Sequence, residues 1–261
     1  MSQFHTYKNI NIHYSDSGKG QSVVLLHGFL ENLNMWKALS KELLTKYRVI
    51  CIDLLGHGKT ECLGYIHTME MMAEAVKSVL NHLKIDRFFL IGHSMGGYVA
   101  LAYSNKYEKN IIGLCLVNST SQSDSEERKI NRDRAIDAVK QNHKTYVRIS
   151  ISNLFRTKNR KLFLKEIKQL VTEALEMPVQ GIIAALEGMK IRFNQEKVLQ
   201  SKHFKTMMII GRKDPVLNYV AMIKELKNTN VLGVELADGH MSYIENQKDF
   251  TYNIMHFIEK F

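Results

Sequence analysis

The chain has 261 residues, of which 45% are hydrophobic and 24% are charged, a composition typical of a globular protein. No apolar run approaches the roughly 20 residues that cross a bilayer, which excludes a membrane-spanning helix. Lysine and arginine outnumber aspartate and glutamate by 36 to 26, but no nucleic-acid-binding motif accompanies this charge, and we expect no nucleic-acid partner.

Residues 1–20 alternate between polar and apolar side chains and end in a Ser-Asp-Ser-Gly turn, a pattern that predicts a β-hairpin. The same stretch lacks the apolar segment and cleavage site of a secretion signal, so we expect a cytoplasmic protein. The three cysteines, Cys51, Cys62 and Cys115, share no close spacing and predict neither a disulfide framework nor a zinc site. We interpret Cys51 and Cys115 as core residues, and we expect no metal or other cofactor.

Apolar runs of strand length alternate with amphipathic segments along most of the chain. Uninterrupted apolar runs predict strands that are covered on both faces, as in a parallel sheet. The predicted strands are residues 23–26, 49–52, 88–91, 111–117, 207–210 and 231–236. The predicted helices are residues 33–47, 69–83, 98–107, 216–226 and 250–258. This repeated alternation indicates an α/β fold with a doubly wound sheet.

Residues 121–204 interrupt the alternation, because they contain charged, amphipathic, mostly helical sequence and no convincing strand. The alternation resumes at residue 207, and the chain is close to the limit of about 250–300 residues for a single hydrophobic core. We therefore predict one core domain, residues 1–120 and 205–261, with a helical cap or lid inserted at residues 121–204.

Most of the excess positive charge of the chain lies in this predicted cap. Many of its basic residues follow helical spacing, and we interpret them as the solvated surface of the cap helices. The alternative is that some of the arginines Arg128, Arg132, Arg134 and Arg192 face the mouth of a pocket, where they would favour anionic substrates.

The pentapeptide Gly-His-Ser-Met-Gly at residues 92–96 lies between a predicted strand and a predicted helix. Glycine tolerates strained backbone and allows a strand and a helix to approach closely, which predicts a sharp turn with Gly92 and Gly96 on either side of Ser94. Such a turn exposes the serine hydroxyl at the carboxyl end of the sheet and at a helix N-terminus, which favours developing negative charge. The motif therefore predicts that Ser94 is a nucleophile.

An exposed serine needs a general base and a group that orients the base. His240 follows the last predicted strand in a loop, and an imidazole can accept and return a proton near neutral pH. We predict that Asp214 is the orienting acid, because it leaves a strand at the carboxyl end, and Pro215 behind it starts a helix that Asp214 can also cap. Asp124, after the strand at residues 111–117, is the alternative acid.

The negative oxygen of a tetrahedral intermediate must be held by donors that are already in place. His27 and Gly28 end the predicted strand at residues 23–26, which leaves the backbone N–H of Phe29 free to point into the site. We predict that this N–H and the N–H of Met95 form the oxyanion hole.

Together these motifs resemble the α/β-hydrolase family, over nearly the whole chain. The matching landmarks are residues 27–29, 53–58, 92–97, 211–214 and 239–240. The resemblance implies an eight-stranded, mostly parallel sheet with a cap after the sixth strand. It also implies hydrolysis of an ester or related bond through Ser94, His240 and Asp214, and an architectural role for Asp53 and His57.

The chemistry of this family is broad. A serine nucleophile argues against the epoxide hydrolase and haloalkane dehalogenase branches, which use aspartate, whereas carbon–carbon hydrolases, thioesterases, perhydrolases and the lyase of menaquinone synthesis keep the serine. Sequences that resemble that lyase have arginine after the paired glycines. This chain has Tyr98 there, which argues against the lyase. We expect a carboxylesterase-like enzyme that cleaves a small or medium-sized ester through an acyl-enzyme. The alternatives are a carbon–carbon hydrolase or related lyase and, in another class, a non-catalytic ligand receptor.

Overall fold

The computed structural model describes residues 2–227 and 229–260. Within these residues, eight strands form one sheet in the order β1-β2-β4-β3-β5-β6-β7-β8. The strands are β1 (Ser2–Tyr7), β2 (Ile10–Ser17), β3 (Ser22–Leu26), β4 (Arg48–Ile52), β5 (Phe88–His93), β6 (Ile111–Val117), β7 (Lys205–Gly211) and β8 (Leu232–Leu236). The pairs β1–β2 and β2–β4 are antiparallel and all other neighbours are parallel, so the predicted eight-stranded, mostly parallel sheet is confirmed.

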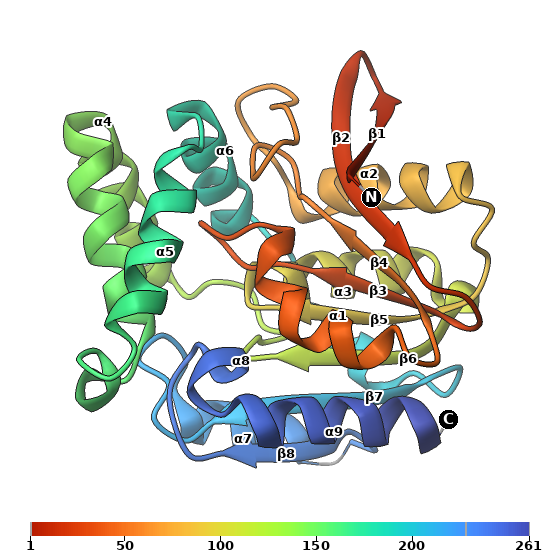
Figure 1. Cartoon of the computed structure of the whole chain (residues 1–261). Coiled ribbons are helices and arrows are strands. Elements are labelled where there is room, and N and C mark those ends of the chain that lie inside the picture. The colour runs from red at the N-terminus through yellow and green to blue at the C-terminus, as the bar shows by residue number, and fades with distance from the viewer. Residues whose placement is uncertain (1, 228, 261) are drawn as a thin grey trace.

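Helices cover both faces of the sheet. The α-helices are α1 (Lys37–Leu43), α2 (Met69–His82), α3 (Met95–Lys106), α4 (Glu126–Leu154), α5 (Leu164–Leu175), α6 (Val179–Lys190), α7 (Tyr219–Leu226), α8 (Ser242–Glu245) and α9 (Gln247–Lys260). Short 3-10 helices are η1 (Leu33–Trp36), η2 (Glu108–Asn110), η3 (Thr157–Asn159) and η4 (Glu196–Gln200). In Figure 1, α1 and α9 lie in front of the sheet and α2 and α3 lie behind it. None of the helices in the described part of the chain has the length and apolarity that a membrane span requires.

Two predicted helices are shorter than the sequence pattern suggested. The helix predicted at residues 33–47 is divided into η1 and α1, and α1 ends at Leu43, after which the chain forms a turn in which the Leu43 carbonyl accepts from the N–H groups of Lys46 and Tyr47. The helix predicted at residues 216–226 begins only at Tyr219, where the side chain of Asn218 caps it.

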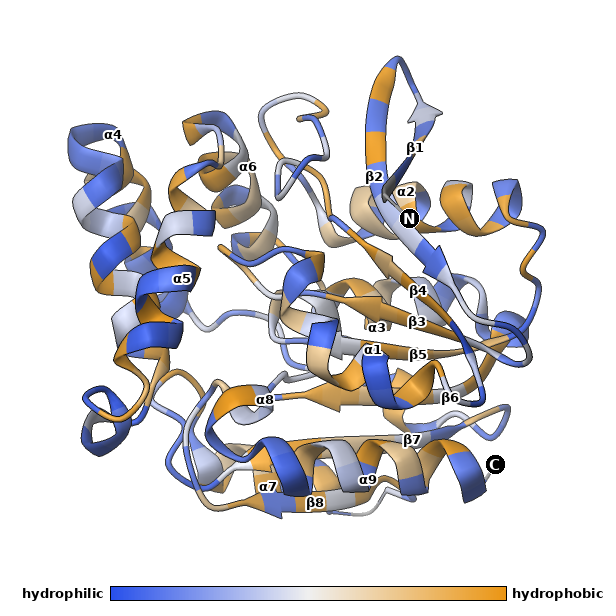
Figure 2. Ribbon diagram, in the orientation of Figure 1, coloured by the Kyte–Doolittle hydropathy of each residue, from blue (hydrophilic) through white to orange (hydrophobic). Residues whose placement is uncertain are grey.

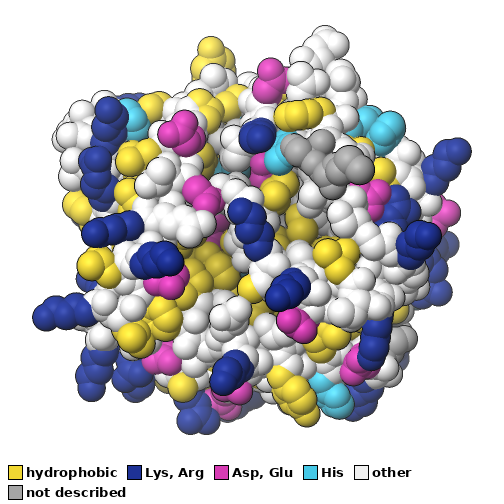
Figure 3. Space-filling view, in the orientation of Figure 1, with side chains coloured by type: hydrophobic (Ala, Val, Ile, Leu, Met, Phe, Trp, Pro, Cys, Tyr) yellow, Lys and Arg dark blue, Asp and Glu magenta, His cyan; other side chains and the backbone are white. Residues whose placement is uncertain are grey.

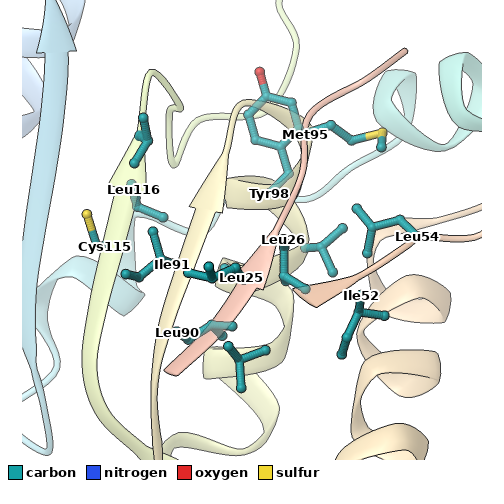
Figure 4. Close-up of a cluster of buried hydrophobic side chains, with 14 of the residues drawn as sticks. Leu25, Leu26, Ile52, Leu54, Leu90, Ile91, Met95, Tyr98, Cys115 and Leu116 are labelled. Carbon is teal, nitrogen blue, oxygen red and sulfur yellow. The ribbon is translucent and has the colours of Figure 1, made fainter. Parts of the chain in front are cut away.

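The core is built from the central parallel strands. Every residue of β3 and of β5 is buried, as expected for strands covered on both faces. Figure 4 shows side chains of β3, β5 and β6 meeting in one cluster, which includes Cys115. Cys51 is buried as well, and burial raises the pKa of its thiol to about 11. Both cysteines are therefore core residues, as their sequence setting indicated.

Residues 121–204, all of which the structure describes, contain no strand. Their main elements are α4, which packs against α5 and α6, and the three helices stand together beyond one end of the sheet (Figure 1). In Figure 2, α4 and α5 carry hydrophilic residues interspersed with hydrophobic ones, whereas the central strands β3, β5 and β6 are mainly hydrophobic. We keep the term cap for this segment, and its division from a core of residues 1–120 and 205–261 remains an interpretation.

Candidate active site

Ser94 occupies the sharp turn between β5 and α3. Its backbone has φ 49° and ψ −114°, a conformation that is rare for a residue with a side chain and that stores strain at this point. The glycines on either side allow close packing. A Cβ on Gly96 would collide with the carbonyl oxygens of Leu26 and His27 in the neighbouring strand end, and a Cβ on Gly92 would collide with the backbone of Gly96. The predicted turn with its two small residues is present.

The structure brings Ser94, His240 and Asp214 together. Asp214 Oδ2 lies 2.7 Å from His240 Nδ1, and His240 Nε2 lies 2.9 Å from the hydroxyl oxygen of Ser94. A carboxylate accepts hydrogen bonds, so Nδ1 carries the proton in this pair and Nε2 is left to accept from the Ser94 hydroxyl. The side chains of His240 and Asp214 are only 2% and 3% exposed, which shields this hydrogen-bonded chain from water.

Asp214 has four hydrogen-bond donors around it. Besides His240, the amide of Asn118 donates to it at 3.0 Å, and the N–H groups of Val216 and Leu217 donate at 2.7 and 3.0 Å. Burial alone would raise the pKa of Asp214, but the electrostatic interaction with His240 and these hydrogen bonds outweigh it and lower the pKa. Asp214 is therefore held as a carboxylate. Sequence reasoning missed Asn118, whose signal is its position directly after β6, at the carboxyl end of the sheet.

The alternative acid, Asp124, is not brought to His240. Its side chain is fully buried, and its carboxylate binds the guanidinium groups of Arg128, Arg132 and Arg192. These charges and hydrogen bonds outweigh the effect of burial and lower the pKa of Asp124.

The two predicted oxyanion donors are the N–H groups of Phe29 and Met95. The N–H of Met95 is the first in α3 and has no carbonyl partner within the helix. The N–H of Gly28 donates to Glu31 at 2.8 Å, which makes the N–H of Phe29 the next in the loop that can serve a ligand. Phe29 and Ser94 line the same cavity. Phe29 and Met95 therefore remain the predicted donors.

Glu31 and His93 form a buried pair beneath this loop. Glu31 accepts hydrogen bonds from the N–H of Gly28, from His93 Nδ1 at 2.7 Å, and from the hydroxyl of Tyr243 at 2.8 Å. His93 Nε2 lies 3.0 Å from the carbonyl oxygen of His240. Because both ring nitrogens of His93 face acceptors, both carry protons and the ring is an imidazolium. Sequence reasoning missed Glu31 and Tyr243.

The pKa shifts of this pair agree with its geometry. Burial would lower the pKa of His93, but the charge and hydrogen bond of Glu31 outweigh it and raise the pKa. Burial would raise the pKa of Glu31, and the charge of His93 outweighs it in turn and lowers the pKa. A Cβ on Gly28 would collide with the Glu31 carboxylate and the His93 ring, so only glycine fits above the pair. The pair joins the loop after β3, the turn before Ser94 and the loop that carries His240.

The loop at residues 53–58 supports the site from the side. His27 Nε2 accepts from the N–H of Leu54 at 2.9 Å and its Nδ1 donates to the carbonyl of Gly28 at 2.8 Å, so His27 is neutral and its burial lowers its pKa. Asp53 accepts from the backbone N–H groups of Leu33, at the start of η1, and of Lys59. Burial lowers the pKa of His57 to about 3. These contacts are to backbone groups, and the architectural role of Asp53 and His57 stays a prediction.

A cavity of about 480 Å³ opens above Ser94, between the sheet and the cap. This size is within the range of small-molecule sites. Its apolar wall includes Phe29, Leu30, Leu186, Met189 and Val216. Its polar wall comes mainly from α4 and includes Arg128, Asn131, Arg132, Tyr146 and Asn153. A substrate in this cavity can place its reacting bond at Ser94 while the cap contacts the rest of the molecule.

The family model of the alpha/beta hydrolase fold matches residues 21–247. The chain belongs to the α/β-hydrolase fold family. Among curated relatives, uncharacterised proteins of Mycobacterium tuberculosis and Mycobacterium bovis are 29% identical over 117 residues, which is 45% of this chain. The chain spans about a third of their length, 34%.

Other proteins, including the following two, match along almost the whole of this chain. The 2-hydroxy-6-oxononadienedioate/2-hydroxy-6-oxononatrienedioate hydrolase of Paraburkholderia xenovorans is 25% identical, over 95% of this chain and 91% of its own. The solved structure of a thermophilic esterase from Thermogutta terrifontis is 29% identical, with a TM-score of 0.90 over 100% of this chain and 98% of its own. The predicted family and fold are confirmed.

Proposed function

We propose that this protein is a serine hydrolase that cleaves a small or medium-sized ester through an acyl-enzyme intermediate. The observation that carries the proposal is the unbroken hydrogen-bonded chain from the Ser94 hydroxyl through His240 to the Asp214 carboxylate, at the floor of a cavity of about 480 Å³. An elbow serine, an oriented histidine and a buried carboxylate are the parts that nucleophilic catalysis on a carbonyl requires.

In the first half of the proposed reaction, Ser94 Oγ attacks the ester carbonyl carbon and its proton passes to His240 Nε2. The carbonyl oxygen becomes an oxyanion and accepts hydrogen bonds from the N–H groups of Phe29 and Met95. The tetrahedral intermediate then collapses. The bond from carbon to the alcohol oxygen breaks, the alcohol leaves with the proton from His240, and the acyl group remains on Ser94.

In the second half, a water molecule replaces the alcohol. His240 takes a proton from the water as its oxygen attacks the acyl carbon, and the same two N–H groups hold the second oxyanion. Collapse returns the proton to Ser94 Oγ and releases the acid. Asp214 keeps the Nδ1 proton of His240 in place and stabilises the imidazolium that forms in each half.

Carbon–carbon bond hydrolysis is a second candidate. The observation that favours it is the Paraburkholderia xenovorans relative, whose name describes hydrolysis of a dioate with a 2-hydroxy-6-oxo pattern and whose match spans nearly the whole of both chains. The esterase of Thermogutta terrifontis has higher identity over the full chain and supports the first candidate. The same serine, histidine and aspartate would serve either reaction.

Steady-state and stopped-flow kinetics with p-nitrophenyl acetate test the proposal, with a vinylogous diketone as the competing substrate. We expect a burst of nitrophenolate equal to the enzyme concentration, followed by steady turnover, because an acyl-enzyme forms before water attacks. A higher kcat/KM for the diketone would favour carbon–carbon hydrolysis. Neither burst nor turnover with any ester or diketone would instead indicate a ligand receptor.

The proposed setting of the enzyme is the cytoplasm. Cys51, Cys62 and Cys115 are all free thiols, which is the state expected in a reducing compartment.

A further inference from the structure

Two arginines of the cap stand on the wall of the cavity above Ser94. Arg128 and Arg132 are one helical turn apart on α4, so their side chains share a face of the helix, and both line the cavity together with Ser94 and His240. None of the described side chains that line the cavity is acidic. Charged groups on the inner face of a cap helix are costly to bury, which argues for a purpose beyond covering the core.

The cavity arginines belong to a cluster with an excess of positive charge. Asp124 Oδ1 lies 3.0 Å from Arg128 Nε and 2.6 Å from Arg192 Nη1, and Asp124 Oδ2 lies 2.6 Å from Arg132 Nε. One buried carboxylate therefore faces three guanidinium groups. Arg192 is buried behind the cavity, donates to two backbone carbonyls and lies 4.1 Å from the ring centre of Tyr98. The positive charge of Arg192 therefore already has partners. The positive charges of Arg128 and Arg132 are only partly neutralised, because they share one carboxylate with Arg192.

The cavity arginines also have donors to spare. Arg132 uses its Nε for Asp124, and no described group bonds either of its terminal nitrogens. Arg128 uses Nε for Asp124 and Nη1 for the carbonyl of Val216 at 3.1 Å, which leaves its second terminal nitrogen. Asp124 thus binds both guanidinium groups through Nε, which leaves terminal nitrogens of both arginines available to another acceptor. The side chains are 34% exposed for Arg128 and 14% exposed for Arg132, and the space beside them is the cavity.

We infer that Arg128 and Arg132 form a subsite for a carboxylate of the substrate, so that the preferred esters are those whose acyl part carries a second, free carboxylate. This inference rests on the proposed serine hydrolase function. Planar guanidinium groups fixed side by side match the geometry of a carboxylate and lose little freedom when they bind it. The reacting ester then lies at Ser94 while the far carboxylate lies against α4.

The charge distribution on the cap agrees with this division of roles. Figure 3 shows lysine and arginine side chains projecting into solvent on the side where α4 and α5 lie. Lys158, Lys161 and Arg134 are exposed, which agrees with the interpretation of the cap charge as solvated surface. Arg128 and Arg132 do not fit that interpretation, because they line the cavity.

The test compares esters that differ only in charge. The mono-ethyl esters of succinate, glutarate, adipate and suberate are each paired with the ester in which a carboxamide replaces the free carboxylate. We expect kcat/KM for the best carboxylate ester to exceed that of its carboxamide by about ten- to a hundredfold at low salt, the effect of charge-assisted hydrogen bonds. This ratio should decrease as salt rises, because screening slows the capture of a charged substrate.

Substitutions of arginines on α4 show which residues cause the preference for the carboxylate ester. Arg132→Gln should reduce the ratio by about tenfold or more, whereas Arg148→Gln, which removes the same charge from an exposed position of α4, should leave the ratio and the turnover of p-nitrophenyl acetate as in the wild type. The wild-type ratio and its salt dependence provide the test by themselves if Arg132→Gln does not fold.

Two outcomes overturn the inference, and they are distinguishable from a failure of the proposed function. A ratio near one in the wild type, with both esters and p-nitrophenyl acetate hydrolysed, removes the carboxylate subsite and leaves the serine hydrolase intact. Equal ratios in Arg132→Gln and Arg148→Gln likewise remove the subsite alone. No turnover of any ester removes the proposed function and the subsite with it.

Discussion

Replacing Glu31 with glutamine tests whether a buried ion pair holds the active-site loops together. The Glu31 carboxylate and the His93 ring are each only 1% exposed, so water cannot compensate for a lost partner. Glu31→Gln keeps the shape of the side chain and removes its charge. If His93 stayed an imidazolium in the variant, it would be a buried charge without a counterion, which typically costs about 3–5 kcal/mol of stability.

Deprotonation of His93 avoids that cost only at the expense of hydrogen bonds. A glutamine has one acceptor oxygen, and the wild-type carboxylate accepts from the N–H of Gly28, from His93 and from Tyr243. A neutral His93 has a single proton for two acceptors, Glu31 and the carbonyl of His240. With either orientation of the amide, at least one buried partner is lost, which costs about 1–3 kcal/mol. We therefore expect Glu31→Gln to lower the free energy of unfolding by about 1–5 kcal/mol at neutral pH.

The loss of stability should depend on pH in a defined direction. The pKa of His93 is raised in the folded protein above its ordinary value of 6.5. Its pairing with Glu31 is therefore fully present below pH 6.5 and is lost as the pH rises through the folded pKa. The difference in unfolding free energy between the wild type and Glu31→Gln should decrease as the pH rises from 6.5 through the folded pKa of His93.

Urea unfolding at a series of pH values from neutral to alkaline measures this difference. Tyr243→Phe is the matched control, because it removes one hydrogen bond to Glu31, worth about 1.5–3 kcal/mol, and keeps the ion pair. It should lower stability without removing the dependence on pH. Equal stability of Glu31→Gln and wild type at neutral pH, or the same alkaline dependence in both, would refute the reasoning.

Three further substitutions test separate parts of the site. Asp214→Asn should leave the fold intact and reduce kcat for p-nitrophenyl acetate by about ten-thousandfold, because the histidine loses its correct tautomer; a loss below tenfold would contradict the role of this acid. Asp124→Asn removes the charge of the carboxylate that binds three guanidinium groups and should lower the free energy of unfolding by about 3–5 kcal/mol in urea, whereas an unchanged midpoint would refute the cluster. Gly96→Ala places a Cβ against two backbone carbonyls and should cost about 1–3 kcal/mol, seen as a lower Tm; an unchanged Tm would show that the turn can relax.

The sequence was sufficient to predict the positions of Ser94, His240 and Asp214 because each follows a strand of a parallel sheet. The carboxyl ends of parallel strands meet at one edge, so residues far apart in the chain are expected there together. The structure brings these three side chains together within hydrogen-bond distance. The central strands could also be predicted, because strands that are covered on both faces have unbroken apolar sequences.

The buried pair of Glu31 and His93 could not be predicted in this way. Glu31 lies in a loop and His93 ends β5, 62 residues apart in the chain, and Tyr243 is 212 residues from Glu31, so only the packed structure defines their contact. The role of the cavity arginines could not be predicted either, because the sequence does not distinguish a charged residue on the inner face of a helix from one on the outer face. Arg128 and Arg134 have the same charge on the same helix, and only the position of Asp124 and the cavity separates their roles.

Mapping of a covalent adduct tests the central claim most directly. The protein is treated with a fluorophosphonate, digested, and analysed by mass spectrometry, in parallel with Ser94→Ala. We expect a single adduct on Ser94 in the wild type, no adduct in Ser94→Ala, and a loss of about a millionfold in turnover of p-nitrophenyl acetate in the variant. An adduct on another serine, or labelling and turnover of Ser94→Ala at the wild-type level, would contradict the assignment of Ser94 as the nucleophile.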